Sequence, residues 1–134
     1  MTLKKGLKNG TIDCINSNHT PWHLEGKELE FLYAEFGAIG LESTFGLANL
    51  ALNKTISIEA LIEKMTLRNR EIFSLPIPEI EEGAIANLTI FQPGVKWEFS
   101  KSSIYSKSKN SPLIGKQLNG KVIAVINNKK VSLA

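Results

Sequence analysis

Two histidines and an asparagine lie close together near the start of the chain, in the sequence Asn18-His19-Thr20-Pro21-Trp22-His23. Imidazole and carboxamide groups can bind metal ions and form hydrogen bonds to a ligand. His19 and His23 have the spacing of two metal ligands on one helix face, but Pro21 opposes a helix there. Two imidazoles are also fewer than the three protein ligands of a catalytic zinc. Spacing therefore leaves two interpretations open, a metal pair and ordinary surface or structural histidines.

The segment before these residues predicts where they lie in the fold. Residues 11–16, Thr-Ile-Asp-Cys-Ile-Asn, are rich in β-branched side chains and bounded by turn formers, which predicts a strand. Residues 17–38 have little periodicity and predict a long loop. Catalytic groups gather at the ends of strands in α/β sheets and barrels, and loops of this length are often functional. The candidate site is therefore this loop.

Apolar spacing and capping residues predict the other elements. A helix ends at Lys8 before Asn9-Gly10, and another covers 41–52, burying Leu41, Phe45, Ala48 and Leu52. Ser57 and Thr66 are expected to cap two further helices, ending near Met65 and Phe73. The remaining predictions are strands at 87–91 and 96–99 around a turn at Pro93-Gly94, a loop at 101–115, and a hairpin of 121–126 and 130–133 around Asn127-Asn128. A lone apolar strand usually belongs to a larger sheet, so this order of elements is typical of a piece of a larger α/β protein.

Composition excludes several classes of protein. The chain has 134 residues, of which 43% are hydrophobic and 22% charged, as in a soluble globular domain. No apolar run approaches the roughly 18 residues of a membrane span, and no apolar stretch follows the basic N-terminus as in a secretory signal. The single Cys14 cannot form an internal disulfide, which favours a reducing, cytoplasmic location.

Charge is unevenly distributed along the chain. Residues 96–134 contain eight lysines and one acidic residue, Glu98, for a net charge of +7, whereas residues 1–95 have a net charge of −4. A stand-alone basic binding module is one interpretation of the lysines, and a solvated sheet with protected edges is the other. No arginine or aromatic platform accompanies these lysines, so the pattern does not favour nucleic acid as a partner.

Residues 10–22, Gly-Thr-Ile-Asp-Cys-Ile-Asn-Ser-Asn-His-Thr-Pro-Trp, resemble a segment of the dihydroorotases, a family of cyclic amidohydrolases. The family's pattern there is Gly-Thr-Ile-Asp-x-Ile-x-Ser-Asp-His-x-Pro-His, around the eighth barrel strand. The resemblance continues in order through 28–31, 36–43, 82–84, 87–91, 106–112 and 120–122, and so covers nearly the whole chain.

The resemblance implies an α/β plus β fold. Residues 1–78 would form the C-terminal end of a (β/α)8 amidohydrolase barrel, with its last strand and helices. Residues 79–134 would form part of the small β-sandwich domain that such enzymes carry.

The resemblance also assigns the site. Asn18 aligns with the family's catalytic aspartate, a metal ligand and proton shuttle, and Trp22 aligns with its substrate-binding histidine. His19 matches the family, His23 lies one place after that histidine, and Phe36 and Gly37 match a stretch whose backbone contacts substrate. Zinc is expected in active full-length members, but the family's other metal ligands precede this segment, so no metal site is predicted in this chain.

The resemblance leaves two functions open beside the basic module. An amide cannot take up a proton near neutral pH, which favours a non-catalytic homologue acting as a scaffold or assembly partner in pyrimidine biosynthesis. Its partner would be aspartate carbamoyltransferase or an active dihydroorotase. The alternative is an active dihydroorotase-type hydrolase when full length. The isolated chain is expected to form a homo-oligomer, and no membrane partner is expected.

Overall fold

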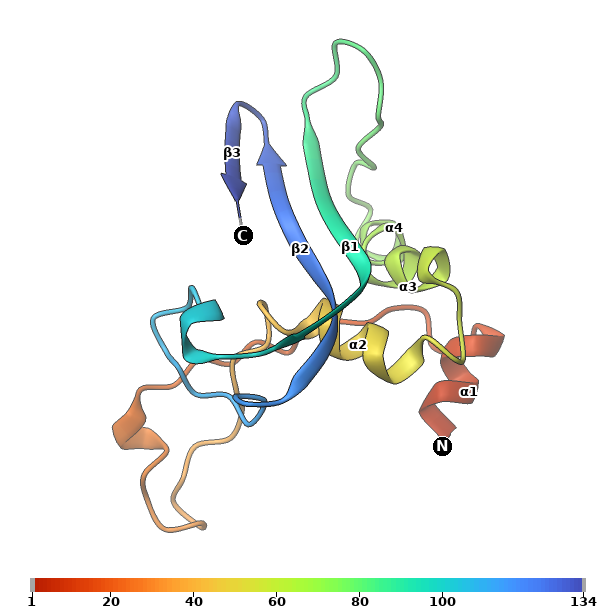
Figure 1. Cartoon of the computed structure of the whole chain (residues 1–134). Helices are drawn as coiled ribbons and strands as arrows, with labels where there is room; N and C mark the ends of the chain where they lie inside the picture. Colours follow the sequence, from red (N-terminus) through yellow and green to blue (C-terminus); the bar gives the residue numbers. More distant parts are fainter. Residues whose placement is uncertain (1, 134) are drawn as a thin grey trace.

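The computed structural model describes residues 2–133, which form a small antiparallel sheet with helices packed beside it (Figure 1). Its elements, in chain order, are α1 (Thr2–Asn9), the 3-10 turn η1 (Leu24–Gly26), α2 (Thr44–Leu52), α3 (Ile58–Met65), α4 (Leu67–Ile72), β1 (Asn87–Glu98), the 3-10 turn η2 (Lys101–Ser103), β2 (Gln117–Asn127) and β3 (Lys130–Leu133).

The three strands form one sheet in the order β1-β2-β3, and both pairs are antiparallel. β1 runs without interruption through Pro93-Gly94, where the register with β2 shifts between Gln92 and Lys96. The predicted turn at this position is therefore wrong. Proline has no N–H to contribute to a sheet, and an unpaired bulge accommodates it as well as a turn does.

The hairpin between β2 and β3 is confirmed, with its turn one residue later than predicted. Asn127 pairs with Lys130, so Asn128 and Lys129 form the two-residue loop. Asn128 has a φ of 56°, a left-handed conformation that asparagine tolerates better than most residues.

Local signals predicted the helices well, with two corrections. Ser57 caps α3 as expected, its Oγ accepting from the Ala60 N–H at 3.2 Å. Thr66 does not cap α4, because its hydroxyl donates instead to the Ile62 carbonyl at 2.7 Å. α2 begins at Thr44 rather than at residue 41, after a turn in which the Ser43 and Thr44 N–H groups both donate to the Gly40 carbonyl.

The strand predicted at residues 11–16 is not formed. Residues 13–16 are extended but lie in no sheet, and the Ile15 N–H donates to the Lys64 carbonyl at 2.9 Å. A strand needs a neighbouring strand to complete its hydrogen bonds, and within residues 2–133 no strand lies beside this segment.

α2 lies directly on β2 because each element has a glycine where the other presents a larger side chain. A Cβ on Gly46 would lie 3.0 Å from the Cβ of Leu118, and a Cβ on Gly120 would lie 2.7 Å from the ring of Phe45. The buried residues of α2 are consequently Gly46, Asn49 and Leu52, so that only Leu52 of the predicted apolar face is fully buried.

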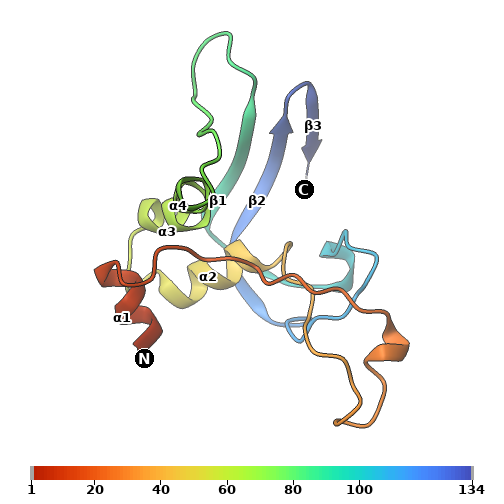
Figure 2. The ribbon, with the colours of Figure 1, turned by 180° about the vertical axis from the view of Figure 1, so that it is seen from behind.

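The central core joins the loop before α2 to the β region. Ile39, Phe99, Ile104 and Leu118 are each at most 4% exposed and contact one another, with Trp97, Leu113 and Ile114 around them. Seen from behind, residues 11–38 cross the helices and project away from the sheet beside residues 99–116 (Figure 2). No helix among residues 2–133 is long and apolar enough to cross a membrane.

Candidate functional site

The candidate site lies in the long loop over residues 17–41, and backbone contacts hold its two arms together. His19 and Ala38 form an isolated parallel bridge, and the Thr20 N–H donates to the Ala38 carbonyl at 2.9 Å. The predicted residues at the start and end of this loop are thereby brought to one end of the molecule.

His19 is fixed by the second arm of the loop. Its Nδ1 accepts from the backbone N–H of Gly40 at 3.1 Å and of Leu41 at 3.4 Å. A neutral imidazole whose Nδ1 accepts carries its proton on Nε2. His19 therefore offers a hydrogen-bond donor to a ligand, and its Nδ1 lone pair is already used.

Asn18 is exposed and lies in a left-handed conformation, with a φ of 44°. Its N–H donates to the Asn16 Oδ1 at 2.6 Å, and its carbonyl accepts from the Thr20 hydroxyl at 3.0 Å. These local bonds offset part of the cost of the unusual backbone. The side chain is a carboxamide, which can donate and accept hydrogen bonds but has no basic lone pair for a proton.

Trp22 and Phe36 belong to opposite arms and contact each other. The Trp22 indole N–H donates to the Phe36 carbonyl at 2.9 Å, while the Phe36 ring is 86% exposed. The next residue, Gly37, has a φ of 104°, and a Cβ there would lie 2.6 Å from the Thr20 Cβ. Only glycine fits at this position. The Gly37 carbonyl accepts hydrogen bonds from two side chains described below.

His23 does not join His19 in a metal site. The segment between them is extended rather than helical, and His23 packs edge-on against Trp22 with ring centroids 6.2 Å apart. Within residues 2–133 no group of three or more His, Cys, Asp or Glu side chains is placed to hold a metal ion. The described residues therefore do not by themselves supply the ligand set that the zinc of the family resemblance requires.

A second loop, within residues 105–111, completes the site, although no residue type or spacing in it indicates a chemical role. The Ser108 hydroxyl donates to the Trp22 carbonyl at 2.6 Å, and the Asn110 side-chain amide donates to the Gly37 carbonyl at 3.2 Å. The Lys27 ammonium also donates to Gly37, at 3.0 Å. Serine and asparagine are common in any loop, so only the family resemblance over residues 106–112 pointed to this segment.

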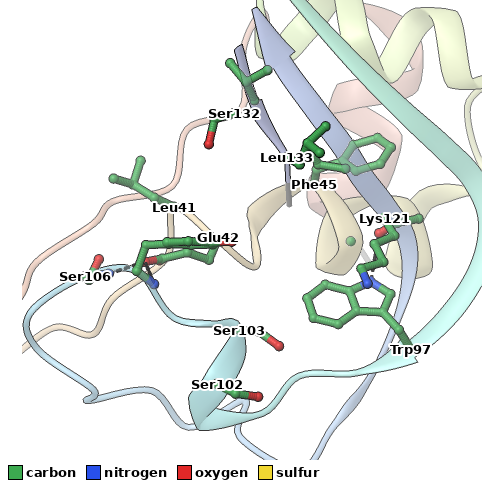
Figure 3. Close-up of a pocket in the computed structure, with 15 residues that line it drawn as sticks. Leu41, Glu42, Phe45, Trp97, Ser102, Ser103, Ser106, Lys121, Ser132 and Leu133 are labelled. Carbon is green, nitrogen blue, oxygen red and sulfur yellow. Dashed lines mark hydrogen bonds between the residues drawn. The ribbon is translucent and has the colours of Figure 1, made fainter. Parts of the chain in front are cut away.

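An open groove of about 660 Å³ lies beside this second loop, between α2 and the sheet (Figure 3). Its apolar wall includes Leu41, Phe45, Trp97 and Leu133, and Glu42 lies at its edge. Burial raises the pKa of Glu42, but hydrogen bonds from Ser106, from its own backbone and from Tyr105 outweigh burial, so the pKa lies below its usual value. Glu42 is therefore an anion at neutral pH.

Curated proteins named dihydroorotase match almost the whole chain. The chain is 36% identical over 130 residues to one from Trichlorobacter lovleyi, covering 96% of this chain and 31% of that protein. It is 41% identical over 129 residues to one from Clostridioides difficile, covering 95% and 30%. The chain thus spans about a third of the length of these relatives. No family model matches the chain.

Solved structures of hydantoinases share the fold. The D-hydantoinase (dihydropyrimidinase) from Thermus sp. superposes with a TM-score of 0.84 at 20% identity, over 98% of this chain and 30% of that one. The dihydropyrimidinase from Brevibacillus agri superposes with a TM-score of 0.82 at 22% identity, over 98% and 30%. Residues 2–133 therefore share the fold of about three tenths of these hydantoinase chains. By sequence, the chain is related to the dihydroorotases and matches the C-terminal portion of these longer proteins.

Proposed function

We propose that the chain is part of a dihydroorotase-like protein that does not hydrolyse its family's cyclic amide and serves as a scaffold or assembly partner. In this proposal residues 1–78 end a (β/α)8 barrel and residues 79–134 contribute to its small β-sandwich domain. The observation that carries it is Asn18, at the position where the family pattern has an aspartate.

Asn18 removes the proton transfer that the site requires. A general base must accept a proton during hydrolysis, and removing one typically lowers the rate 10²- to 10⁴-fold. The adjacent His19 is oriented by two backbone N–H groups that donate to its Nδ1, so in its neutral form it carries its proton on Nε2 and is a donor there rather than a base. Trp22 further replaces an imidazole of the family pattern with an indole.

An active hydrolase is the second candidate, and one observation favours it. The relatives that match at 36% to 41% identity bear the name dihydroorotase. This candidate requires a base other than residue 18, and zinc bound by residues outside 2–133.

Dihydroorotate hydrolysis by the full-length protein with added zinc separates the two candidates. We expect no turnover in the wild type and measurable turnover in an Asn18→Asp, Trp22→His variant, because the variant restores both groups of the family pattern. Turnover in the wild type would refute the non-catalytic function. If neither protein hydrolyses dihydroorotate, the loss of activity extends beyond these two positions.

The proposed partners are aspartate carbamoyltransferase and an active dihydroorotase. A scaffold is expected to co-elute with its partner in size-exclusion chromatography of the purified mixture. If neither enzyme shifts its elution volume when mixed with the full-length protein, the assembly role is refuted, whatever the outcome of the activity assay.

A further inference from the structure

Glu42, to which the sequence assigned no role, anchors the second loop of the site. Its Oε1 accepts from the Tyr105 N–H at 3.0 Å and from the Ser106 N–H at 2.7 Å (Figure 3). Two successive backbone donors on one carboxylate oxygen make charge-assisted bonds, which are stronger than those between neutral groups. The lowered pKa of Glu42 agrees with a carboxylate held in its charged form.

The anchored loop then contacts both arms of the loop over residues 17–41. Ser108 holds the Trp22 carbonyl on the first arm, and Asn110 holds the Gly37 carbonyl on the second. The Asn110 backbone carbonyl also accepts from the Ile39 N–H at 2.9 Å. These contacts begin two residues after Ser106 and end four residues after it. The backbone held by Glu42 is therefore separated from the backbone at the site by only a few residues.

We propose that Glu42 is a positioning residue of the candidate site, acting through residues 105–110. Its carboxylate fixes the backbone at 105–106, this fixes residues 108–110, and these fix the backbone at Trp22, Gly37 and Ile39. The effect passes along one series of hydrogen bonds from the turn before α2 to the two arms of the loop. Glu42 itself need not touch a ligand.

The structure also limits how far this effect reaches. The Gly40 N–H is held independently by His19 Nδ1, at 3.1 Å. Loss of the Glu42 carboxylate should therefore release Ile39 while Gly40, one residue away, stays protected. A general loosening of the domain would release both.

Amide hydrogen exchange in the full-length protein tests this role. Because the role rests on the site proposed above, the readout is backbone protection rather than turnover, and it is independent of whether the protein is an enzyme. The variants are Glu42→Ala, Glu42→Gln and, as a matched control, Glu82→Ala at an exposed turn. We expect Glu42→Ala to speed exchange at Tyr105, Ser106 and Ile39 about tenfold or more.

The controls distinguish positioning from simple destabilisation. Gly40 and the Leu61 N–H of α3 should exchange at wild-type rates, Glu42→Gln should fall between wild type and Glu42→Ala, and Glu82→Ala should match the wild type. Faster exchange at Tyr105 and Ser106 with Ile39 unchanged would overturn the proposal. If Glu42→Ala does not fold, the same comparison in Glu42→Gln decides.

A second set of variants tests the order of the contacts. Ser108→Ala with Asn110→Ala keeps the backbone carbonyl that accepts from Ile39 but removes the side-chain bonds that hold it in place. Exchange at Ile39 should therefore speed up, while the direct bonds of Tyr105 and Ser106 to Glu42 stay intact. Adding Glu42→Ala to this pair should then have little further effect at Ile39, because contacts in one series are not additive. Fully additive effects at Ile39 would overturn the series.

Discussion

At the scale of single residues, Glu42 is a partly buried carboxylate with two backbone donors on its Oε1, while its Oε2 is buried without a hydrogen-bond partner among residues 2–133. Its pKa is lower in the folded chain than in the unfolded chain, so it binds its proton less readily when folded. The resulting stability is present above the unfolded pKa and is lost as the pH falls through the lowered folded value. Glu42 thus contributes to stability at neutral pH and not in strong acid.

A Glu42→Gln variant should therefore change how stability depends on pH. At about pH 7 we expect it to be less stable by about 1–2 kcal/mol, since charge-assisted hydrogen bonds are replaced by neutral ones. The difference should shrink as the pH falls through the lowered folded pKa of Glu42, below which both side chains are uncharged. Urea unfolding at a series of pH values measures this, and a constant difference at every pH would contradict it.

The residues of the site were partly predictable from the sequence. Asn18, His19, Trp22, His23, Phe36 and Gly37 stand in or beside a recognisable pattern, although their roles toward a ligand stay predictions. The partners of this loop were not predictable, because Glu42 and Tyr105 are 63 positions apart and Trp22 and Ser108 are 86 apart. Hydrogen bonds over such separations leave no local signal in side-chain type or spacing.

At the scale of elements, features that depend on a few adjacent residues were mostly predicted correctly from the sequence. Pairings between distant segments were not. The Ser57 cap and the glycine after α1 depend only on adjacent backbone and were found correctly. The strand at 11–16 was wrong because pairing, not composition, makes a strand. The uninterrupted β1 was missed because a bulge and a turn use the same residues.

Asn49 connects α2 to both long strands. Its role was not predicted, because its partners lie far away in the sequence. It is 5% exposed, and its side-chain amide donates to the Pro93 carbonyl at 2.8 Å and the Asn119 carbonyl at 3.0 Å. Pro93 lies in the bulge of β1, so this one amide fixes the bulge against the helix. The polar side chain on an otherwise apolar helix face has a structural explanation.

Asn49→Asp should destabilise the protein although it preserves the size of the side chain. The change removes two donors and places a carboxylate against two carbonyl oxygens, with an expected loss of about 2–3 kcal/mol in the free energy of unfolding. Asn53→Asp, at the exposed C-cap of the same helix, is the matched control and should cost less, about 0.3–1 kcal/mol, from the new negative charge at the helix C-terminus. Equal urea midpoints for the two variants would contradict this role.

At the scale of the whole molecule, large apolar side chains are exposed where an isolated monomer would leave them in contact with water. Phe31 and Leu32 are each 88% exposed and Tyr33 is 71% exposed, at the projecting end of the loop over residues 17–41. Contiguous apolar surface of this kind usually contacts another surface. The chain also spans only about a third of the relatives it matches, so much of what surrounds it in those proteins lies outside it.

The 134-residue chain expressed alone should therefore self-associate. We expect light scattering to give a mass above that of one chain, and a Phe31→Ser, Leu32→Ser variant to shift the mass toward the monomer. As a comparison, Phe36→Ser makes the same apolar-to-polar change at another exposed residue of the loop. A compact wild-type monomer across the accessible concentrations would contradict the prediction.

The close approach of α2 and β2 also has a consequence for how this fold can diverge. Gly120 has a φ of 95°, and a Cβ there would lie 2.7 Å from the Phe45 ring, while a Cβ on Gly46 would lie 3.0 Å from the Leu118 Cβ, a tight contact. A larger residue at position 120 must displace the Phe45 ring and adopt a left-handed backbone, and one at position 46 must displace Leu118, so both substitutions disturb the contact between helix and strand. Lineages that carry this fold are thus expected to retain both glycines through long periods of drift, and mutant libraries should leave both positions unrandomised.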